Sequence, residues 1–243
     1  TAVRENWQWK PAVAYCRYAD DFVLIVKGTK AQAEAIREEC RGVLEDSLKL
    51  RLNMDKTRIT HVNDGFIFLG HRIISKRSRY GDMRVVSTIP KEKARNFAAS
   101  LTAQLSGNYS ESKIDMVEML NRKLKGWAAF YQFVDFKARV FSYIDRVVFW
   151  KLAHWLARKY RAGIASLMRW WCKSPKPGQS KTWVLFGKTN HGKLSGEVLY
   201  RLVGQGKKLF RWRLPEGNPY LRTETRNTYT SRFTEVAMAF ASV

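Results

Sequence analysis

The pattern of apolar and polar residues changes near residue 90. Before that point, short apolar runs alternate with polar breaks. The apolar runs at 13–16 and 22–26 lie on either side of a polar break, which predicts a β-hairpin. Helical spacing of apolar residues follows over about 30–48, and further short strands are expected at 65–75 and 83–88, with a basic loop at 76–82 between the last two.

After residue 90 the pattern becomes helical. Pro90 suits the first turn of a helix. Apolar residues then recur at steps of three and four, which predicts amphipathic helices over about 90–105, 110–134 and 137–160 that can form a small bundle. A further helix at 164–172, a Pro- and Gly-containing break at 174–178 and a short strand at 183–186 are expected next. The predicted fold class is α+β.

Composition favours a globular protein that binds a polyanion. The chain has 243 residues, of which 45% are hydrophobic, so it can bury one large or two small cores. Its 44 Lys and Arg residues against 21 Asp and Glu residues give a formal net charge of +23. A charge excess this large attracts nucleic acid strongly, whereas a merely soluble basic protein would not need it.

The positions of the cysteines and the hydropathy of the chain limit the class of protein and its expected cellular location. Cys16, Cys40 and Cys172 are far apart and have no paired Cys or His spacing, so neither a zinc module nor a disulfide framework is predicted. No apolar stretch approaches the ~20 residues of a membrane span, and no signal peptide is recognised. A cytoplasmic protein without a membrane partner is therefore expected.

The most informative motif is Tyr18-Ala19-Asp20-Asp21, at the break between the first two apolar runs. Two ionised carboxylates at a mostly buried hairpin tip are costly unless a cation or hydrogen-bond donors lie beside them. Mg²⁺ prefers oxygen ligands and is usually held by one or two carboxylates together with substrate phosphates. The alternative is a solvated turn, since Asp is a favoured turn residue.

The order of motifs resembles the second half of the polymerase palm in reverse transcriptases encoded by group II introns. That family has a Tyr-Ala-Asp-Asp hairpin, a helix, a Leu-Asn-x-x-Lys-Thr segment and a Phe-Leu-Gly strand pair, which match residues 18–21, 30–48, 52–57 and 68–70. Residues 120–131 look like the maturase-specific thumb segment of the same family. The resemblance implies a partial palm at 1–89, a three-helix thumb or maturase domain at 90–162, and a mixed basic region at 163–243 that is a candidate for DNA binding.

The resemblance also implies roles for residues of the palm. Asp20 would be a direct ligand of two catalytic Mg²⁺ ions, and Asp21 would be a second ligand or would tune them. Tyr18 and Ala19 would flank the metal site. Lys56 would lie near the nucleotide triphosphate, although a solvated turn lysine is an equal alternative. The remaining nucleotide- or primer-binding candidates by resemblance are Asn53, Phe68, Leu69, Gly70 and His71.

Candidate nucleic-acid-binding residues lie in the helical part and in the tail. The thumb segment contributes two basic residues, and the helix over 137–160 carries a basic stripe at helical spacing: Arg122, Lys123, Lys151, His154, Arg158 and Arg161. In the tail, basic residues interleave with aromatics over 207–213, a composition that can stack on bases and meet phosphates. These are Lys207, Lys208, Arg211 and Arg213, for which a half-buried strand with outward cations is an equal alternative.

Two parts of the resembling polymerases are not found in this sequence. Their palm has a third metal-binding aspartate on an earlier strand, and their fingers also precede the Tyr-Ala-Asp-Asp hairpin. Because the chain starts at Thr1, shortly before that hairpin, we expect a complementary N-terminal chain or segment to supply both. The expected partners are RNA, as template or intron, and a DNA primer. The alternative function is a maturase-type RNA-binding protein that assists splicing without polymerising.

Overall fold

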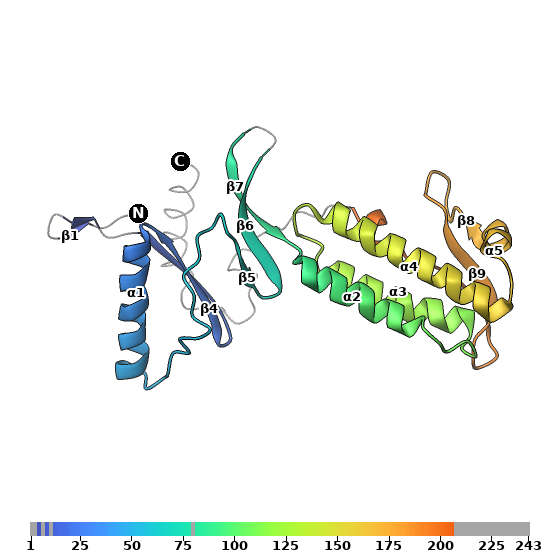
Figure 1. The fold of residues 1–243 in the computed structure, drawn as a ribbon, viewed down its shortest axis with the longest axis horizontal. Helices are drawn as coiled ribbons and strands as arrows, with labels where there is room; N and C mark the ends of the chain where they lie inside the picture. The colour runs from blue at the N-terminus through green and yellow to red at the C-terminus, as the bar shows by residue number, and fades with distance from the viewer. Residues whose placement is uncertain (1–3, 6–7, 10–11, 79–80, 207–243) are drawn as a thin grey trace, which may run out of the picture. The chain divides into compact units, whose positions relative to one another are not determined.

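In a computed structural model, the described residues are 4–5, 8–9, 12–78 and 81–206. Figure 1 shows the element order as separate small sheets in the first part and long helices in the second. Mixed helix and strand content confirms the predicted α+β class. The described residues up to Gln205 form one unit.

The first part consists of short antiparallel sheets and one helix. Strands β1 (Arg4–Glu5) and β2 (Gln8–Trp9) pair with each other, as do β3 (Ala12–Tyr18) and β4 (Asp21–Lys27). Helix α1 (Lys30–Gly42) begins at a capping box of Thr29 and Gln32 and continues into a π-helical turn, η1 (Val43–Ser47). The predicted hairpin and the predicted helix near 30–48 are therefore confirmed.

A three-stranded antiparallel sheet follows, with the order β5-β6-β7. Its strands are β5 (Phe66–Phe68), β6 (His71–Arg77) and β7 (Met83–Thr88). The basic segment predicted as a loop joins β6 to β7. Residues 49–65 contain no helix or strand, and the Leu-Asn-x-x-Lys-Thr segment includes a turn at 54–56.

Three long helices form the body of the second part. They are α2 (Lys91–Gln104), α3 (Lys113–Phe130) and α4 (Lys137–Tyr160), close to the predicted ranges. Ser112 begins α3, because its hydroxyl accepts a hydrogen bond from the Ile114 backbone N–H at 3.1 Å. The second predicted helix extended to 134, but α3 ends at Phe130 and residues 131–136 turn the chain into α4.

The residues after α4 complete the same core. Helix α5 (Ile164–Trp171) leads into a sheet of order β10-β9-β8, built from β8 (Cys172–Lys173), β9 (Thr182–Lys188) and β10 (Leu194–Val198), and a 3-10 turn, η2 (Leu202–Gly204), follows. The Pro- and Gly-containing break at 174–178 lies in the hairpin connection between β8 and β9. It therefore turns a strand pair around and does not separate two domains.

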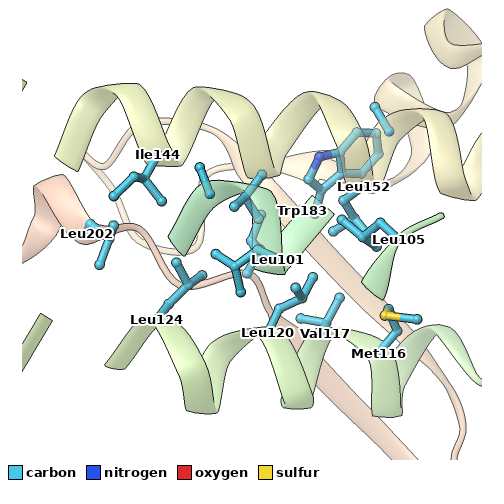
Figure 2. Close-up of a cluster of buried hydrophobic side chains, with 14 of the residues drawn as sticks. Leu101, Leu105, Met116, Val117, Leu120, Leu124, Ile144, Leu152, Trp183 and Leu202 are labelled. Atoms are coloured by element: carbon cyan, nitrogen blue, oxygen red, sulfur yellow. The ribbon is translucent and has the colours of Figure 1, made fainter. Parts of the chain in front are cut away.

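Figure 2 shows the core in which these elements meet. Apolar side chains from the helices, from β9 and from η2 point into one interior. Trp183 of β9 is fully buried there, and its indole N–H donates to the Phe149 carbonyl of α4 at 3.1 Å. Every buried apolar residue in the described part of the chain lies at or after Ile89. The helical bundle and the small C-terminal sheet thus share one core.

Candidate metal and nucleic-acid site

The Tyr-Ala-Asp-Asp motif forms a two-residue β-turn between β3 and β4. Tyr18 pairs with Asp21, which leaves Ala19 and Asp20 as the turn residues. Ala19 has a φ of 51°, in the left-handed region that costs an L-residue roughly 1–2 kcal/mol. The Arg17 guanidinium donates to the Ala19 carbonyl at 2.7 Å, which stabilises this turn. The motif therefore presents its two carboxylates at the end of a tight, partly strained hairpin.

Both carboxylates are exposed. All residues from 13 to 21 are exposed, in contrast to the mostly buried tip expected from the flanking apolar runs. The hairpin forms a two-stranded sheet of its own, and no described residue between 12 and 88 is fully buried. Within the described ranges, neither the Asp20 nor the Asp21 carboxylate has a hydrogen-bond or ion-pair partner. The two side chains are left available to ligands.

As a donor set, Asp20 and Asp21 match the type that Mg²⁺ prefers. Mg²⁺ is usually bound by one or two carboxylates together with phosphate oxygens and water. Among the residues that the structure describes, no group of three or more His, Cys, Asp or Glu side chains could hold a metal ion. The described residues thus offer two adjacent carboxylates for a metal and no third.

The Phe-Leu-Gly-His motif forms a second two-residue turn, between β5 and β6. Phe68 pairs with His71, and both turn residues have positive φ, 48° at Leu69 and 78° at Gly70. Positive φ at both positions is the geometry of a type I′ turn, whose twist matches the flanking strands and which favours Gly. The turn geometry explains the glycine in this motif.

The end of helix α3 anchors this second turn. The Tyr131 hydroxyl donates to the Gly70 carbonyl at 3.1 Å. The His71 ring lies 4.9 Å from the Phe130 ring and 5.3 Å from the Tyr131 ring, measured between centroids. His71 Nδ1 is also 3.0 Å from the Leu69 carbonyl oxygen. The predicted primer-binding turn is therefore attached to the helical bundle.

Asn53 and Lys56 lie in an exposed turn. The Asn53 side-chain oxygen accepts from the Lys56 backbone N–H at 3.2 Å, and the Asn53 carbonyl accepts from Thr57. Asn53 thus stabilises the turn that carries Lys56, whose side chain is exposed. No hydrogen bond, ion pair or ring contact between described residues joins the Asp20–Asp21 turn to Lys56 or to His71.

The basic candidates of the helices are all exposed. On α3, Arg122 pairs with Glu118 at 3.1 Å, and Lys123 lies beside it. Lys151 and His154 lie on the exposed face of α4. At the end of that helix, Arg158 donates to the Tyr109 hydroxyl at 3.1 Å, and Arg161 has a φ of 50°. The four tail candidates, Lys207, Lys208, Arg211 and Arg213, lie outside the described residues.

One further lysine of α4 has a structural role that sequence reasoning missed. Lys159 donates to the backbone carbonyls of Tyr109 and Glu111 at 2.7 and 2.8 Å, so it holds the loop before α3. It also helps to shape the environment of Lys113, whose Nζ lies 4.1 Å from the centre of the Trp171 ring. Burial, and secondarily the charge of Lys159, lowers the pKa of Lys113.

Two buried polar residues, also missed, fix the chain after β10. Asn121 of α3 donates to the Val198 carbonyl at 2.8 Å and accepts from the Tyr200 N–H at 2.7 Å. Asp145 of α4 accepts from the N–H groups of Leu202 and Val203 at 2.8 and 3.1 Å. Burial raises the pKa of Asp145, although these hydrogen bonds and Arg201 oppose the shift. The one signal in the sequence that could have indicated Asn121 and Asp145 is that each is a polar residue at a position on the apolar face of its helix.

Comparisons with known proteins agree with this arrangement. Residues 2–73 match the family described as "Reverse transcriptase (RNA-dependent DNA polymerase)", and residues 94–175 match "Group II intron, maturase-specific domain". The first match contains the Asp20–Asp21 turn and the Phe-Leu-Gly-His turn. The second contains α3, α4, α5 and most of α2.

Three curated relatives show the extent of the similarity. Protein YkfC of Escherichia coli (strain K12) is 91% identical over 105 residues, which cover 43% of this chain and 28% of that protein. The group II intron-encoded protein LtrA of Lactococcus lactis subsp. cremoris is 30% identical over 49% of this chain and 20% of LtrA. Nuclear intron maturase 2, mitochondrial, of Arabidopsis thaliana is 24% identical over 60% of this chain and 24% of the relative.

The two family matches thus define one class, a reverse transcriptase segment joined to a group II intron maturase-specific domain. The chain belongs to the group II intron reverse transcriptase and maturase family. It spans about a quarter of the length of the relatives it matches. Within the described residues, no helix has the length and apolar character needed to cross a bilayer.

Proposed function

We propose that this chain supplies the Tyr-Ala-Asp-Asp hairpin and the thumb of an RNA-directed DNA polymerase of the group II intron type. The observation that carries the proposal is the β3–β4 turn, which presents two adjacent, exposed carboxylates without partners among the described residues. An RNA-binding surface gains nothing from two carboxylates facing phosphates, whereas a metal-dependent polymerase requires them.

In this proposal Asp20 and Asp21 hold Mg²⁺ together with a third carboxylate from outside the chain. The metal, when bound, would neutralise the triphosphate and favour attack by the primer 3′-hydroxyl. The small side chain of Ala19 would leave room for the primer end, and Tyr18, which is 65% exposed, would flank it. Arg17 would keep the turn in place through its hydrogen bond to the Ala19 carbonyl.

The other site residues would position the substrates. Lys56 would meet the triphosphate as a point charge, held by the turn that Asn53 stabilises. The Phe68–His71 turn would contact the primer strand, with Gly70 allowing close approach of the backbone. The hydrogen bond from Tyr131 supports this role, because a turn that binds the primer must be held at a fixed position relative to the thumb.

The basic residues of α3 and α4 would bind the phosphates of a template-primer duplex or of intron RNA. Their exposure and the formal net charge of +23 support this role. The proposal assigns a palm to residues 1–89, a thumb to 90–162 and a basic, DNA-binding region to 163–243. The tail candidates at 207–213 would add to nucleic-acid binding in that last region.

A complementary N-terminal chain or segment would cover the apolar residues of the palm part. Residues 12–88 carry large exposed apolar side chains on several strands, among them Val13, Tyr15, Ile25, Ile67 and Val85. Soluble proteins rarely leave such surface and open sheet edges uncovered. The same partner would contribute the fingers and the third metal ligand.

Primer extension on an RNA template tests the proposal. The chain is purified with its associated polypeptide, and extension is measured with Mg²⁺ and again after chelation. We expect Asp20→Asn and Asp21→Asn to abolish extension while RNA binding persists. Asp46→Asn, which alters an exposed carboxylate of η1, is the matched control and should retain activity. Extension at the wild-type rate by both active-turn variants would rule out the metal assignment.

A second function, RNA binding that assists splicing without polymerisation, is favoured by the match of 94–175 to the maturase-specific domain. It predicts steep salt dependence, with log K falling by about 0.7 per phosphate contact for each unit of log salt on single strands. Splicing assistance that survives both Asp→Asn substitutions would support it. If the two Asp→Asn substitutions abolish both splicing assistance and primer extension, the polymerase function alone is favoured.

A further inference from the structure

A cleft of about 270 Å³ lies between the β6–β7 hairpin and the corner that joins α3 to α4. From the hairpin it is lined by Lys76, Arg77, Arg84 and Val86, and from the corner by Asp135 and Phe136. The catalytic turn and the basic stripe of α4 contribute none of these residues. The cleft combines an aromatic ring with three cations.

Phe136 holds an unfavourable backbone conformation without burying its ring. Its φ and ψ are 54° and 25°, in the left-handed region, where a bulky residue is an outlier. The ring is 63% exposed, so its burial cannot offset a strain of roughly 1–2 kcal/mol. Strain of this kind persists where the surrounding structure imposes it and is concentrated at ligand sites.

One cation of the cleft contacts this ring, and two more line the same cleft. Lys76 Nζ lies 5.2 Å from the centre of the Phe136 ring, within the range of a cation–π contact. Arg77 donates to the Gly81 carbonyl at 3.2 Å, and Arg84 lies 3.7 Å from Asp82 in an exposed pair. Such exposed pairs contribute little, so the guanidinium of Arg84 can turn to a stronger anion. Asp135 is the one carboxylate lining the cleft.

Hydrogen bonds hold the two walls together. The Asp135 backbone N–H donates to the Ser87 carbonyl of β7 at 2.8 Å. A few residues away, Tyr131 bonds to the Gly70 carbonyl of the β5–β6 turn. The aromatic ring and the cations therefore belong to elements that are fixed relative to each other, as a binding site requires.

We propose that this cleft binds one unpaired nucleotide of a nucleic-acid strand. The base stacks on Phe136, and the adjoining phosphates contact Lys76 and Arg84. Aromatic rings beside cations are the means by which proteins hold single strands without reading sequence. The inference rests on the proposed function, because it assumes that a strand reaches the thumb; it adds a place on this chain where an unstacked base binds.

Binding of fluorescently labelled single-stranded RNA and DNA of the same sequence to the chain purified with its associated polypeptide tests the inference. Phe136→Ala removes the ring, and Phe136→Gly removes both the ring and the strain, since Gly adopts a φ near 54° freely. Both should weaken binding roughly 5- to 150-fold, the stacking loss per base converted at tenfold per 1.4 kcal/mol. Phe136→Trp keeps an aromatic ring at this position and should retain binding.

Matched control variants distinguish binding at a specific site from non-specific electrostatic binding. Phe186→Ala removes a ring that is 70% exposed on β9, and Lys93→Gln removes an exposed cation of α2. We expect Phe136→Ala to weaken binding more than Phe186→Ala does, and Lys76→Gln to weaken it more than Lys93→Gln does. A duplex should compete poorly for the cleft, because its bases are already stacked.

The outcomes distinguish this inference from the proposed function. If Phe136→Gly binds as tightly as the wild type, or if Phe136→Ala loses no more affinity than Phe186→Ala does, the nucleotide cleft is overturned. The proposed function would remain intact. If the wild-type protein, purified with its associated polypeptide, binds neither RNA nor DNA, both are overturned. If the Phe136 variants lose binding to only one of RNA and DNA, the result supports the cleft and shows which of the two it binds. Displacement of the strand by an acidic peptide but not by free nucleotides would show a protein-binding surface instead.

Discussion

Residues 12–88 and residues 89–205 of this chain differ in where their apolar side chains lie. No described residue of the first region is buried, although it contains strands as apolar as those of many protein cores. In the second region, side chains from α2, α3, α4, α5, β9 and η2 share one core. Apolar side chains thus form an enclosed interior in the second region and lie on open surfaces in the first.

The comparison shows which region can supply its own stability. A two-stranded hairpin such as β3–β4 is marginally stable in water unless something packs on it. Three long helices with a small sheet against them bury enough apolar surface to fold cooperatively. The first region therefore takes its final stability from contacts outside itself, which agrees with the proposed N-terminal partner.

Truncation of a core residue is the most direct way to break this comparison. Leu120 is fully buried in α3, and Leu120→Ala should lower the free energy of unfolding by about 2–5 kcal/mol. Ile25 of β4 is exposed, and Ile25→Ala should change it by no more than about 0.5 kcal/mol. Urea unfolding followed by circular dichroism measures both. Equal effects of the two substitutions would contradict the division into two regions.

Buried hydrogen bonds give the next largest effect. Asn121→Ala removes the partners of the Val198 carbonyl and of the Tyr200 N–H. Leaving buried polar groups unpaired costs about 1–3 kcal/mol each, so a loss of at least that size is expected in urea unfolding. Asn96→Ala, on the exposed face of α2, is the matched control and should be nearly neutral. A neutral Asn121→Ala would mean that the segment after β10 is not held by α3.

Sequence periodicity predicted the elements of the second region well, because burial imposes the spacing from which helices are recognised. The three helices, α5 and a strand at 183–186 all follow from it. It did not predict that residues 163–205 share the helical core, because long-range contacts such as Trp183 with Phe149 leave no local pattern. The roles of Asn121 and Asp145 were missed for the same reason.

For the candidate site, sequence motifs located the two turns but not their surroundings. The Asp-Asp and Leu-Gly turns follow from short motifs between apolar runs. The sequence left open whether Asp20 and Asp21 are buried or lie in a solvated turn, because apolar flanks indicate burial only when a covering surface is present. The roles of the site residues stay predictions. Phe136 gave no signal, since a left-handed φ at a non-glycine residue cannot be recognised from sequence.

The smallest expected effect lies at the contact between the two regions. Tyr131→Phe removes the hydroxyl that donates to the Gly70 carbonyl and keeps the ring against His71. We expect the β5–β6 turn to open more easily by about 0.5–1.5 kcal/mol, seen as faster hydrogen exchange of its amides. Amides of β3–β4 serve as the internal control, because no described contact joins them to Tyr131. If exchange in the β5–β6 turn stays unchanged, the helical core does not hold this turn, and the two regions are coupled only through the chain.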